Sequence, residues 1–208
     1  MLARTLFTAE HEQFRQSVRR FTQKEVAPHY DQWEKDGCVS RELWRKAGAQ
    51  GLLGVNLPEA YGGGEANDFR YSTIVIEEMM LANAPGVGFS LHADVAAPYM
   101  VAYTTDEQKE RWLPGIAAGD LILAIAMTEP STGSDLAAVR TTAIRDGDHY
   151  IVNGSKTFIT NGYQGDLAII AARTDPSKGP KGISLLMLEA GMEGFTKGQK
   201  LDKVGQDE

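Results

Sequence analysis

The apolar side chains change their spacing near Asp120, and this change constrains the fold more than any other feature of the sequence. Before it they recur every three or four residues, the spacing of an amphipathic helix. After it come short runs rich in Ile, Leu, Phe and Thr, separated by turn residues, a pattern typical of strands. Helices followed by strands indicate two segregated parts. We therefore expect an α+β chain, all-α over residues 1–121 and β over 122–208.

Three helices can be placed from this spacing and from capping residues. The first carries the apolar stripe Phe14, Val18 and Phe21 and is expected to end at Pro28. Ser40 is a typical N-cap and is predicted to open the second. The side chains expected to form the buried side of the third are Phe69, Thr73, Ile76 and Met80.

A further helix and a loop are indicated by local signals. Thr105 and Gln108 fit a capping box that opens a helix, which Pro114 is expected to interrupt. Residues 57–64 contain three consecutive glycines, so we predict a loop there.

Beyond Asp120 the candidate strands alternate with turns. They are residues 121–128, 141–145, 149–152, 157–160, 167–173 and 183–189. Asn153-Gly154 is a strong hairpin signal between two of them. Residues 195–204 are predicted as one more strand or extended segment, after which the chain stops. A small antiparallel sheet would be left with an unpaired edge. We therefore expect an incomplete antiparallel β-barrel and a chain that ends prematurely.

Charge and hydropathy exclude several classes of function. The chain carries 21 basic and 28 acidic residues, a net charge of −7, and neither part is basic, so a nucleic-acid partner lacks its electrostatic footprint. The longest apolar run, Leu121–Met127, is far shorter than the ~20 residues of a membrane-spanning helix. The single cysteine, Cys38, favours a reducing compartment. The N-terminal residues lack a signal or transit peptide pattern, so we expect a cytoplasmic protein.

Residues 125–135 are the stretch that most favours ligand binding. An expected strand runs there into a turn dense in Pro, Gly and hydroxyl side chains, which would direct backbone N–H groups and hydroxyls toward one point. Such a loop suits a phosphate or the polar edge of a heterocycle. An ordinary loop shaped by Pro and Gly explains the same composition. Residues 150–162, taken alone, predict only a hairpin and a following strand.

Four motifs in collinear order resemble the acyl-CoA dehydrogenase family of flavoenzymes. They are G-L-L-G-V-N-L-P-E-A-Y-G-G at 51–63, T-D-E-Q-K-E-R-W-L-P at 105–114, A-M-T-E-P-S-T-G-S-D at 126–135 and Y-I-V-N-G-S-K-T-F-I-T-N-G at 150–162. F-S-L-H at 89–92 and A-I-A-M-T-E-P at 124–130 look most similar to the long-chain branch. The likeness covers nearly the whole chain, as the N-terminal domain and part of the middle domain.

The resemblance implies a fold and a reaction. The family has an N-terminal helical domain, a middle β-domain and a C-terminal four-helix domain, assembled as a homotetramer. With FAD it converts a medium-to-long-chain acyl-CoA to the trans-2-enoyl-CoA in fatty acid β-oxidation. The implied electron acceptor is electron-transfer flavoprotein, and the implied location is the cytoplasm, or the mitochondrial matrix for a mature eukaryotic form. No metal ligand is implied.

The resemblance also implies site residues. The positions that match the family's flavin segments are Ile125, Ala126, Met127, Thr128, Gly133 and Ser134 in the first motif and Phe158, Ile159 and Thr160 in the second. Thr128 would bond the flavin pyrimidine edge, and Thr160 the hydride-accepting nitrogen. Ser134 would bond the pyrophosphate and lie near the acyl-CoA substrate.

Three positions depart mildly from the family pattern. Ile125 stands where relatives often have an aromatic residue, and Ser131 replaces a frequent glycine. Phe158 stands where several members have tryptophan, although its ring can still pack on the isoalloxazine.

No catalytic base can be assigned. The family's glutamate lies in the C-terminal domain, beyond residue 208, and Glu129 is better interpreted as a carboxylate that shapes a turn. We therefore expect a fragment that is inactive alone. Two alternatives stay open: an acyl-CoA oxidase-type member of the superfamily, and a non-catalytic remnant that packs against a full-length partner.

Overall fold

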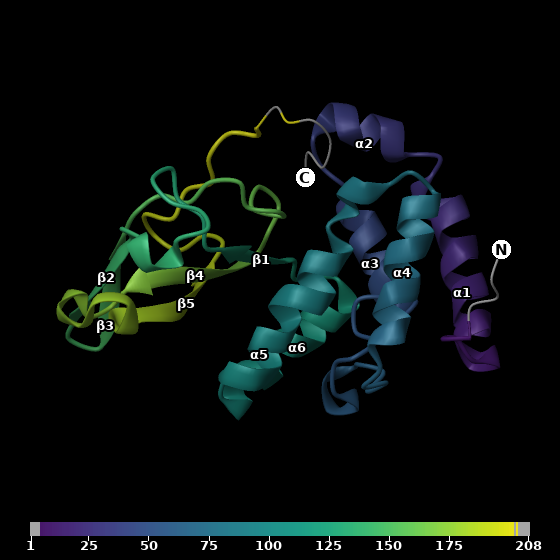
Figure 1. Ribbon diagram of the computed structural model, residues 1–208, viewed down its shortest axis with the longest axis horizontal. Coiled ribbons are helices and arrows are strands. Elements are labelled where there is room, and N and C mark those ends of the chain that lie inside the picture. Colours follow the sequence, from purple (N-terminus) through teal and green to yellow (C-terminus); the bar gives the residue numbers. More distant parts are fainter. Residues whose placement is uncertain (1–4, 202, 204–208) are drawn as a thin grey trace. The chain divides into compact units, whose positions relative to one another are not determined.

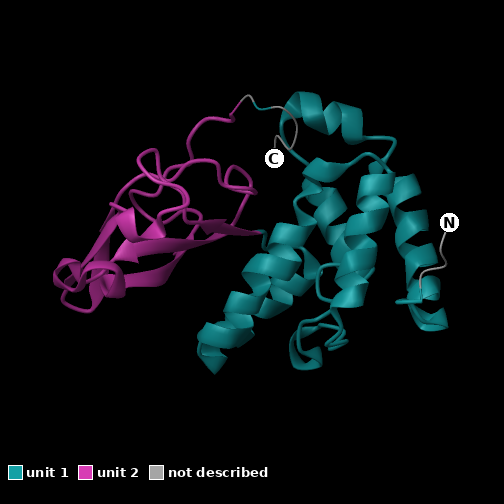
Figure 2. Ribbon diagram, in the orientation of Figure 1, with its two compact units in different colours: residues 1–122, 202–208 teal, residues 123–201 magenta. Residues whose placement is uncertain are grey.

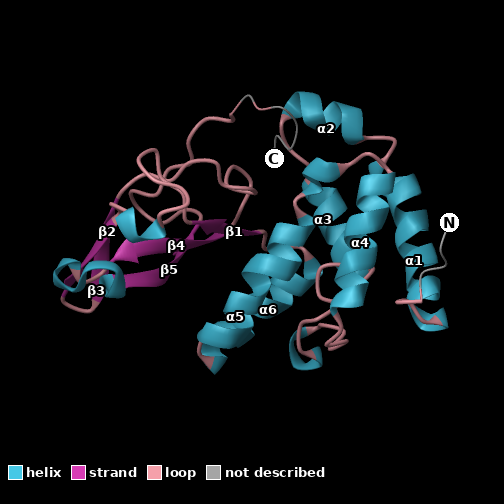
Figure 3. Cartoon of the chain, in the orientation of Figure 1, coloured by secondary structure: helices cyan, strands magenta, loops and turns pink. Residues whose placement is uncertain are grey.

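The chain divides into two compact units at Ile122 and Leu123 (Figure 2). The computed structural model describes residues 5–201 and 203. Within these residues the α-helices belong to the first unit and the β-strands to the second (Figure 3). None of the described helices combines the length and apolar composition needed to cross a bilayer.

The first unit is a set of helices joined by turns and by longer loops, such as residues 50–68 (Figure 1). Its α-helices are α1 (Ala9–Phe21), α2 (Tyr30–Asp36), α3 (Arg41–Ala49), α4 (Phe69–Leu81), α5 (Ala97–Tyr103) and α6 (Asp106–Ala118). Two π-helical segments, Thr22–Val26 after α1 and Leu91–Ala96 before α5, and two 3-10 turns, Glu59–Tyr61 and Pro85–Val87, complete it.

The predicted helix starts are confirmed by the capping contacts. The Ser40 side chain accepts a hydrogen bond from the Leu43 amide at 3.2 Å. Thr105 and Gln108 form the full capping box that opens α6. The predicted interruption at Pro114 is wrong, because α6 continues to Ala118. The helix loses one amide donor at Pro114, but the buried side chains of Leu113 and Ile116 on either side hold it in the core.

The buried face of α4 differs from the predicted one. Phe69 is 63% and Met80 48% exposed, whereas Ile74, Val75 and Met79 are buried. Apolar residues lie all round this helix, so its periodicity does not select one face. The contact with α1 decides which face of α4 is buried, since buried Glu78 pairs there with two arginines of α1.

The core of the first unit forms where α1, α3 and α4 bring their apolar faces together. Val18 and Phe21 of the predicted first stripe are buried, and Phe14 packs against them half-buried. Trp44 of α3 is fully buried and meets the Phe89 ring edge-on at 4.9 Å. This apolar packing supplies most of the stability of such a helical unit.

The second unit contains one open mixed sheet. Its strands are β1 (Leu123–Ala126), β2 (Thr142–Asp146), β3 (His149–Asn153), β4 (Leu167–Arg173) and β5 (Ile183–Glu189). Two pairings, β2 with β3 and β4 with β5, are antiparallel as predicted. The β1–β4 pairing and the single β2–β4 pair at Thr142 and Arg173 are parallel, so the sheet of the expected antiparallel barrel is mixed at these two places. The open sheet agrees with the expected partial barrel.

Two expectations for the second unit are wrong in their local detail. Residues 157–160 form no strand, because Phe158 has a positive φ of 55°, which an extended strand does not permit, and Asn161, with a φ of 62°, follows directly after the range. Asn153-Gly154 closes no hairpin, since β3 ends there and a loop leads to β4. Of the strand or extended segment predicted over 195–204, the described residues 195–201 and 203 form no strand, and residues 202 and 204 lie outside the described part of the chain.

Candidate functional site

The two motifs singled out in the β region lie against each other in the second unit. One follows β1 and the other follows β3, far apart in the chain. The Thr157 amide donates to the Thr128 carbonyl at 3.1 Å. The Lys156 ammonium donates to the Met127 carbonyl at 3.0 Å. These two contacts align the segment around Thr128 with the segment around Thr157.

Glu129 is the buried anchor of this arrangement. It is 5% exposed, and its carboxylate accepts hydrogen bonds from the Arg140 amide at 2.6 Å, the Thr141 amide at 2.9 Å and the Lys156 ammonium at 2.9 Å. The Thr141 hydroxyl donates a further bond. The carboxylate therefore joins its own loop to the start of β2 and to the second motif.

The hydrogen bonds determine the charge state of Glu129. Burial by itself raises the pKa of this carboxyl. The bonds from the Thr141 hydroxyl, the Arg140 amide and Lys156 outweigh that effect and lower the pKa to about 2. The residue is thus a carboxylate at neutral pH, which agrees with its interpretation as a residue that shapes the loop.

The loop after Glu129 is a tight turn. The Glu129 and Thr132 backbones exchange hydrogen bonds of 2.9 and 3.1 Å. The Thr132 hydroxyl donates to the Asp135 carbonyl at 2.6 Å. This hydroxyl is therefore used to close the turn, while Ser131 and Ser134 are exposed.

The predicted site residues differ in their exposure. Ala126 is buried in a small core with Ala143 and Ile170, and Ile159 packs against that core. Half-buried positions are Ile125, Met127, Thr128, Ile159 and Thr160, and exposed positions are Gly133, Ser134 and Phe158. The Phe158 ring is 67% exposed on a backbone with positive φ, so it is displayed on the surface of the unit.

Sequence reasoning missed the residues that hold these segments together. The sequence indicated no role for three residues that bond the first motif or β1. Lys156 and Thr141 bond the first motif, and Asn161 bonds β1. The Asn161 side-chain amide donates to the Leu123 carbonyl at 3.1 Å. A usable signal was present for one pair, because Lys156 is the only charged residue of the second motif and Glu129 stands within the first.

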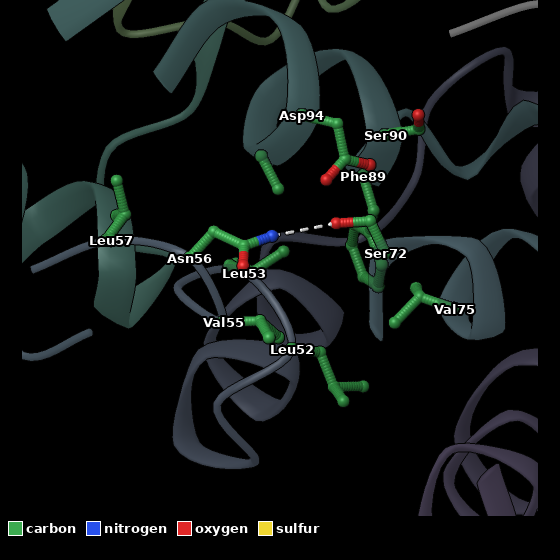
Figure 4. A pocket seen from close by; sticks show the side chains of 11 residues that line it. Leu52, Leu53, Val55, Asn56, Leu57, Ser72, Val75, Phe89, Ser90 and Asp94 are labelled. Atoms are coloured by element: carbon green, nitrogen blue, oxygen red, sulfur yellow. Dashed lines mark hydrogen bonds between the residues drawn. The ribbon is translucent and has the colours of Figure 1, made fainter. Parts of the chain in front are cut away.

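The helical unit contains a small cavity with a mainly apolar lining and a few polar side chains (Figure 4). Asn56 donates to Ser72 at 3.1 Å there, and Asp94 faces the same space. Burial raises the pKa of Asp94, against hydrogen bonds from Ser72 and Ser90 that lower it. The volume is about 10 Å³, room for a single water molecule, so this cavity cannot take an acyl chain.

Family models match both units of the chain. The model described as "Acyl-CoA dehydrogenase, N-terminal domain" matches residues 8–120, and "Acyl-CoA dehydrogenase, middle domain" matches residues 124–208. The chain therefore belongs to the acyl-CoA dehydrogenase family. Members of this family are oxidoreductases and flavoproteins of fatty acid metabolism.

Individual relatives agree with the family assignment. The long-chain specific acyl-CoA dehydrogenase, mitochondrial, of Sus scrofa is 52% identical over 97% of this chain and 47% of its own length. The crystal structure of acyl-CoA dehydrogenase from Geobacillus kaustophilus superposes with a TM-score of 0.94 at 50% identity, over 99% of this chain and 54% of that one.

A flavin is present in one solved relative. A glutaryl-CoA dehydrogenase from Mycobacterium smegmatis in complex with FADH2 superposes with a TM-score of 0.85 at 30% identity, over 97% of this chain and 51% of that one. The chain spans about half the length of the curated relatives it matches.

Proposed function

We propose that residues 1–121 and 122–208 are the N-terminal and middle domains of an FAD-dependent acyl-CoA dehydrogenase. Its reaction would be the α,β-dehydrogenation of a medium-to-long-chain acyl-CoA to the trans-2-enoyl-CoA, a step of fatty acid β-oxidation. The observation that carries the proposal is the alignment of the two motif segments through Thr128, Lys156 and Thr157. The 52% identity to a long-chain enzyme supports the substrate class.

The residues present fit an FAD site. The exposed Phe158 ring offers an apolar face for an isoalloxazine, and the half-buried Thr128 and Thr160 offer hydroxyl groups beside it. Gly133 and Ser134 are exposed in the turn, where backbone and hydroxyl donors suit a pyrophosphate. Ser134 would also contact the substrate. When bound, FAD supplies the hydride acceptor of the reaction.

The remaining predicted positions would act through packing or backbone. Buried Ala126 can present only its backbone, and Ile125, Met127 and Ile159 would shape the wall of the site. A hydroxyl at Thr160 directed at the flavin would stabilise charge that develops on the ring during reduction.

We place the catalytic base outside residues 1–208. Glu129 is a poor candidate, because several hydrogen bonds occupy its carboxylate and lower its pKa to about 2. A general base needs a pKa near the working pH and reach to the proton that it removes. The chain alone would therefore be inactive.

The partners and location follow from the family and are likewise proposals. We expect a homotetramer that passes electrons to electron-transfer flavoprotein. We expect the protein in the cytoplasm, or in the mitochondrial matrix, where the porcine relative is found by its name.

The test is anaerobic mixing of the intact purified protein with long-chain acyl-CoA, followed through the flavin absorption. We expect FAD to copurify with the protein. We expect the absorption of the oxidised flavin to decrease when the acyl-CoA is added. Air should then yield little hydrogen peroxide, whereas rapid peroxide formation would identify an oxidase. A protein that takes up no FAD would overturn the proposal.

A further inference from the structure

Lys156 occupies a central position between the two segments of the proposed flavin site. Its ammonium donates to the Met127 carbonyl at 3.0 Å and to the Glu129 carboxylate at 2.9 Å. These two acceptors flank Thr128, the residue proposed for the flavin pyrimidine edge. One lysine side chain therefore bonds the backbone before that residue and the side chain of the residue after it.

The same lysine also fixes the second segment. The next residue, Thr157, donates its amide to the Thr128 carbonyl at 3.1 Å. Phe158, with its exposed ring, follows directly. The Lys156–Met127 and Thr157–Thr128 bonds thus link the segment that contains Thr128 to the segment that contains Phe158.

Glu129 holds the lysine in this place. Its side chain is 3% exposed and that of Lys156 11%, so the pair is shielded from water. The carboxylate is fixed in turn by the Arg140 amide at 2.6 Å and the Thr141 amide at 2.9 Å. A buried ion pair with its remaining hydrogen bonds satisfied is well suited to specify one geometry.

Direct contact between the Lys156 charge and a ligand is unfavourable. The ammonium already donates to two acceptors, and the side chain is largely buried. Two of its three N–H donors are used within the protein, and we therefore expect Lys156 to influence the site through Thr128 and Phe158.

We propose that Glu129 and Lys156 are a pair of positioning residues that set the spacing of Thr128 and Phe158 and thereby the affinity of the protein for FAD. This inference rests on the proposed function and deepens it. Residues that support the ligands of metal sites typically change affinity by about 10–100-fold when they are removed, and we expect an effect of the same order here.

The test compares E129Q, K156M and the double variant E129Q/K156M in the intact protein. Hydrogen exchange is measured without flavin, and the FAD dissociation constant and the unfolding midpoint are measured on the same samples. Each single variant should raise the rate of amide hydrogen exchange in both residues 127–134 and residues 155–160. Each should also weaken FAD binding about tenfold.

The double variant separates positioning from stability. It leaves no unpaired buried charge, so its unfolding midpoint should recover relative to K156M. Its FAD affinity should stay low, because the bonds that flank Thr128 are still missing. If the pair served stability alone, the FAD affinity of the double variant would recover together with its unfolding midpoint.

R19M is the matched control. Arg19 donates to buried Glu78 at 2.8 Å in the helical unit, so this variant should lower stability without changing exchange in 127–134 or 155–160. Unchanged FAD affinity in K156M, or exchange confined to the mutated segment, would overturn the positioning role. A wild-type protein that binds no FAD would overturn the proposed function instead, while the exchange measurement would still decide whether the pair couples the segments.

Discussion

Gly154 and Thr141 lie so close together that a Cβ atom on Gly154 would be 2.2 Å from the Thr141 hydroxyl oxygen. That hydroxyl donates to Glu129, the buried anchor of the loop after β1. The absence of a side chain at residue 154 therefore permits the second motif to lie against Thr141, which bonds Glu129 of the first motif.

We predict that G154A destabilises the protein by about 1–3 kcal/mol, the usual cost of forcing extra atoms into a packed site. Urea unfolding monitored by circular dichroism measures the change. G133A is the matched control, since a Cβ there meets nothing within 4 Å, and its stability should stay close to that of the wild type. Equal stability of G154A and G133A would contradict the close approach.

Acid should weaken the fold through Glu129. Its folded pKa of about 2 lies below its ordinary value of 4.5, so the unfolded chain binds the proton more readily. The stability that this carboxylate contributes is complete above pH 4.5 and is lost as the pH falls toward 2. Other carboxyls titrate in the same range, so the useful quantity is the difference between wild type and E129Q in urea unfolding from pH 7 to pH 3. The wild type should lose more stability than E129Q, and parallel curves would refute the assignment.

Glu78 should be required for the packing of α1 against α4. Its buried carboxylate accepts hydrogen bonds from Arg19 at 2.8 Å and from Arg15 at 3.2 Å. Burial raises its pKa, but the two arginines outweigh burial and lower it. E78Q should lower the free energy of unfolding, measured by heat or urea, by about 1–3 kcal/mol. The range is modest because Arg19 is half exposed.

R45M serves as the comparison for E78Q. Arg45 and Asp120 form an ion pair at 2.9 Å, but both side chains are more than half exposed. Water and salt screen such a pair, so R45M should unfold like the wild type. An effect as large as that of E78Q would show that burial does not decide the strength of these pairs.

T160A tests the proposed role of a hydroxyl at the flavin. Removal of one preorganised donor typically slows the chemical step by about a hundredfold. In a protein that also contains the catalytic base, we expect stopped-flow flavin reduction by acyl-CoA to slow by that order, with little change in acyl-CoA affinity. S131A, which removes an exposed hydroxyl of the turn, should reduce its flavin at the wild-type rate. An equal loss of rate and affinity in T160A would reject the role.

Features that depend on neighbours in the chain could be predicted from the sequence. Ser40 and Thr105 cap the helices that they were expected to open. β4 and β5 span the two predicted ranges to the residue. Caps and short apolar runs between turn residues are specified by contacts within a few residues, so a single sequence contains the information.

Tertiary structure decided the features that depend on residues far apart in the chain. The buried face of α4 was set by the arginines of α1, and the parallel β1–β4 pairing brought together segments that sequence order does not connect. The Glu129–Lys156 pair belongs to the same class: the sequence determined that both charges stand inside the two motifs, and the fold determined that they meet. A strand pairing or a buried ion pair gains its free energy only when distant segments are packed together, and local propensity carries no information on which segments these are.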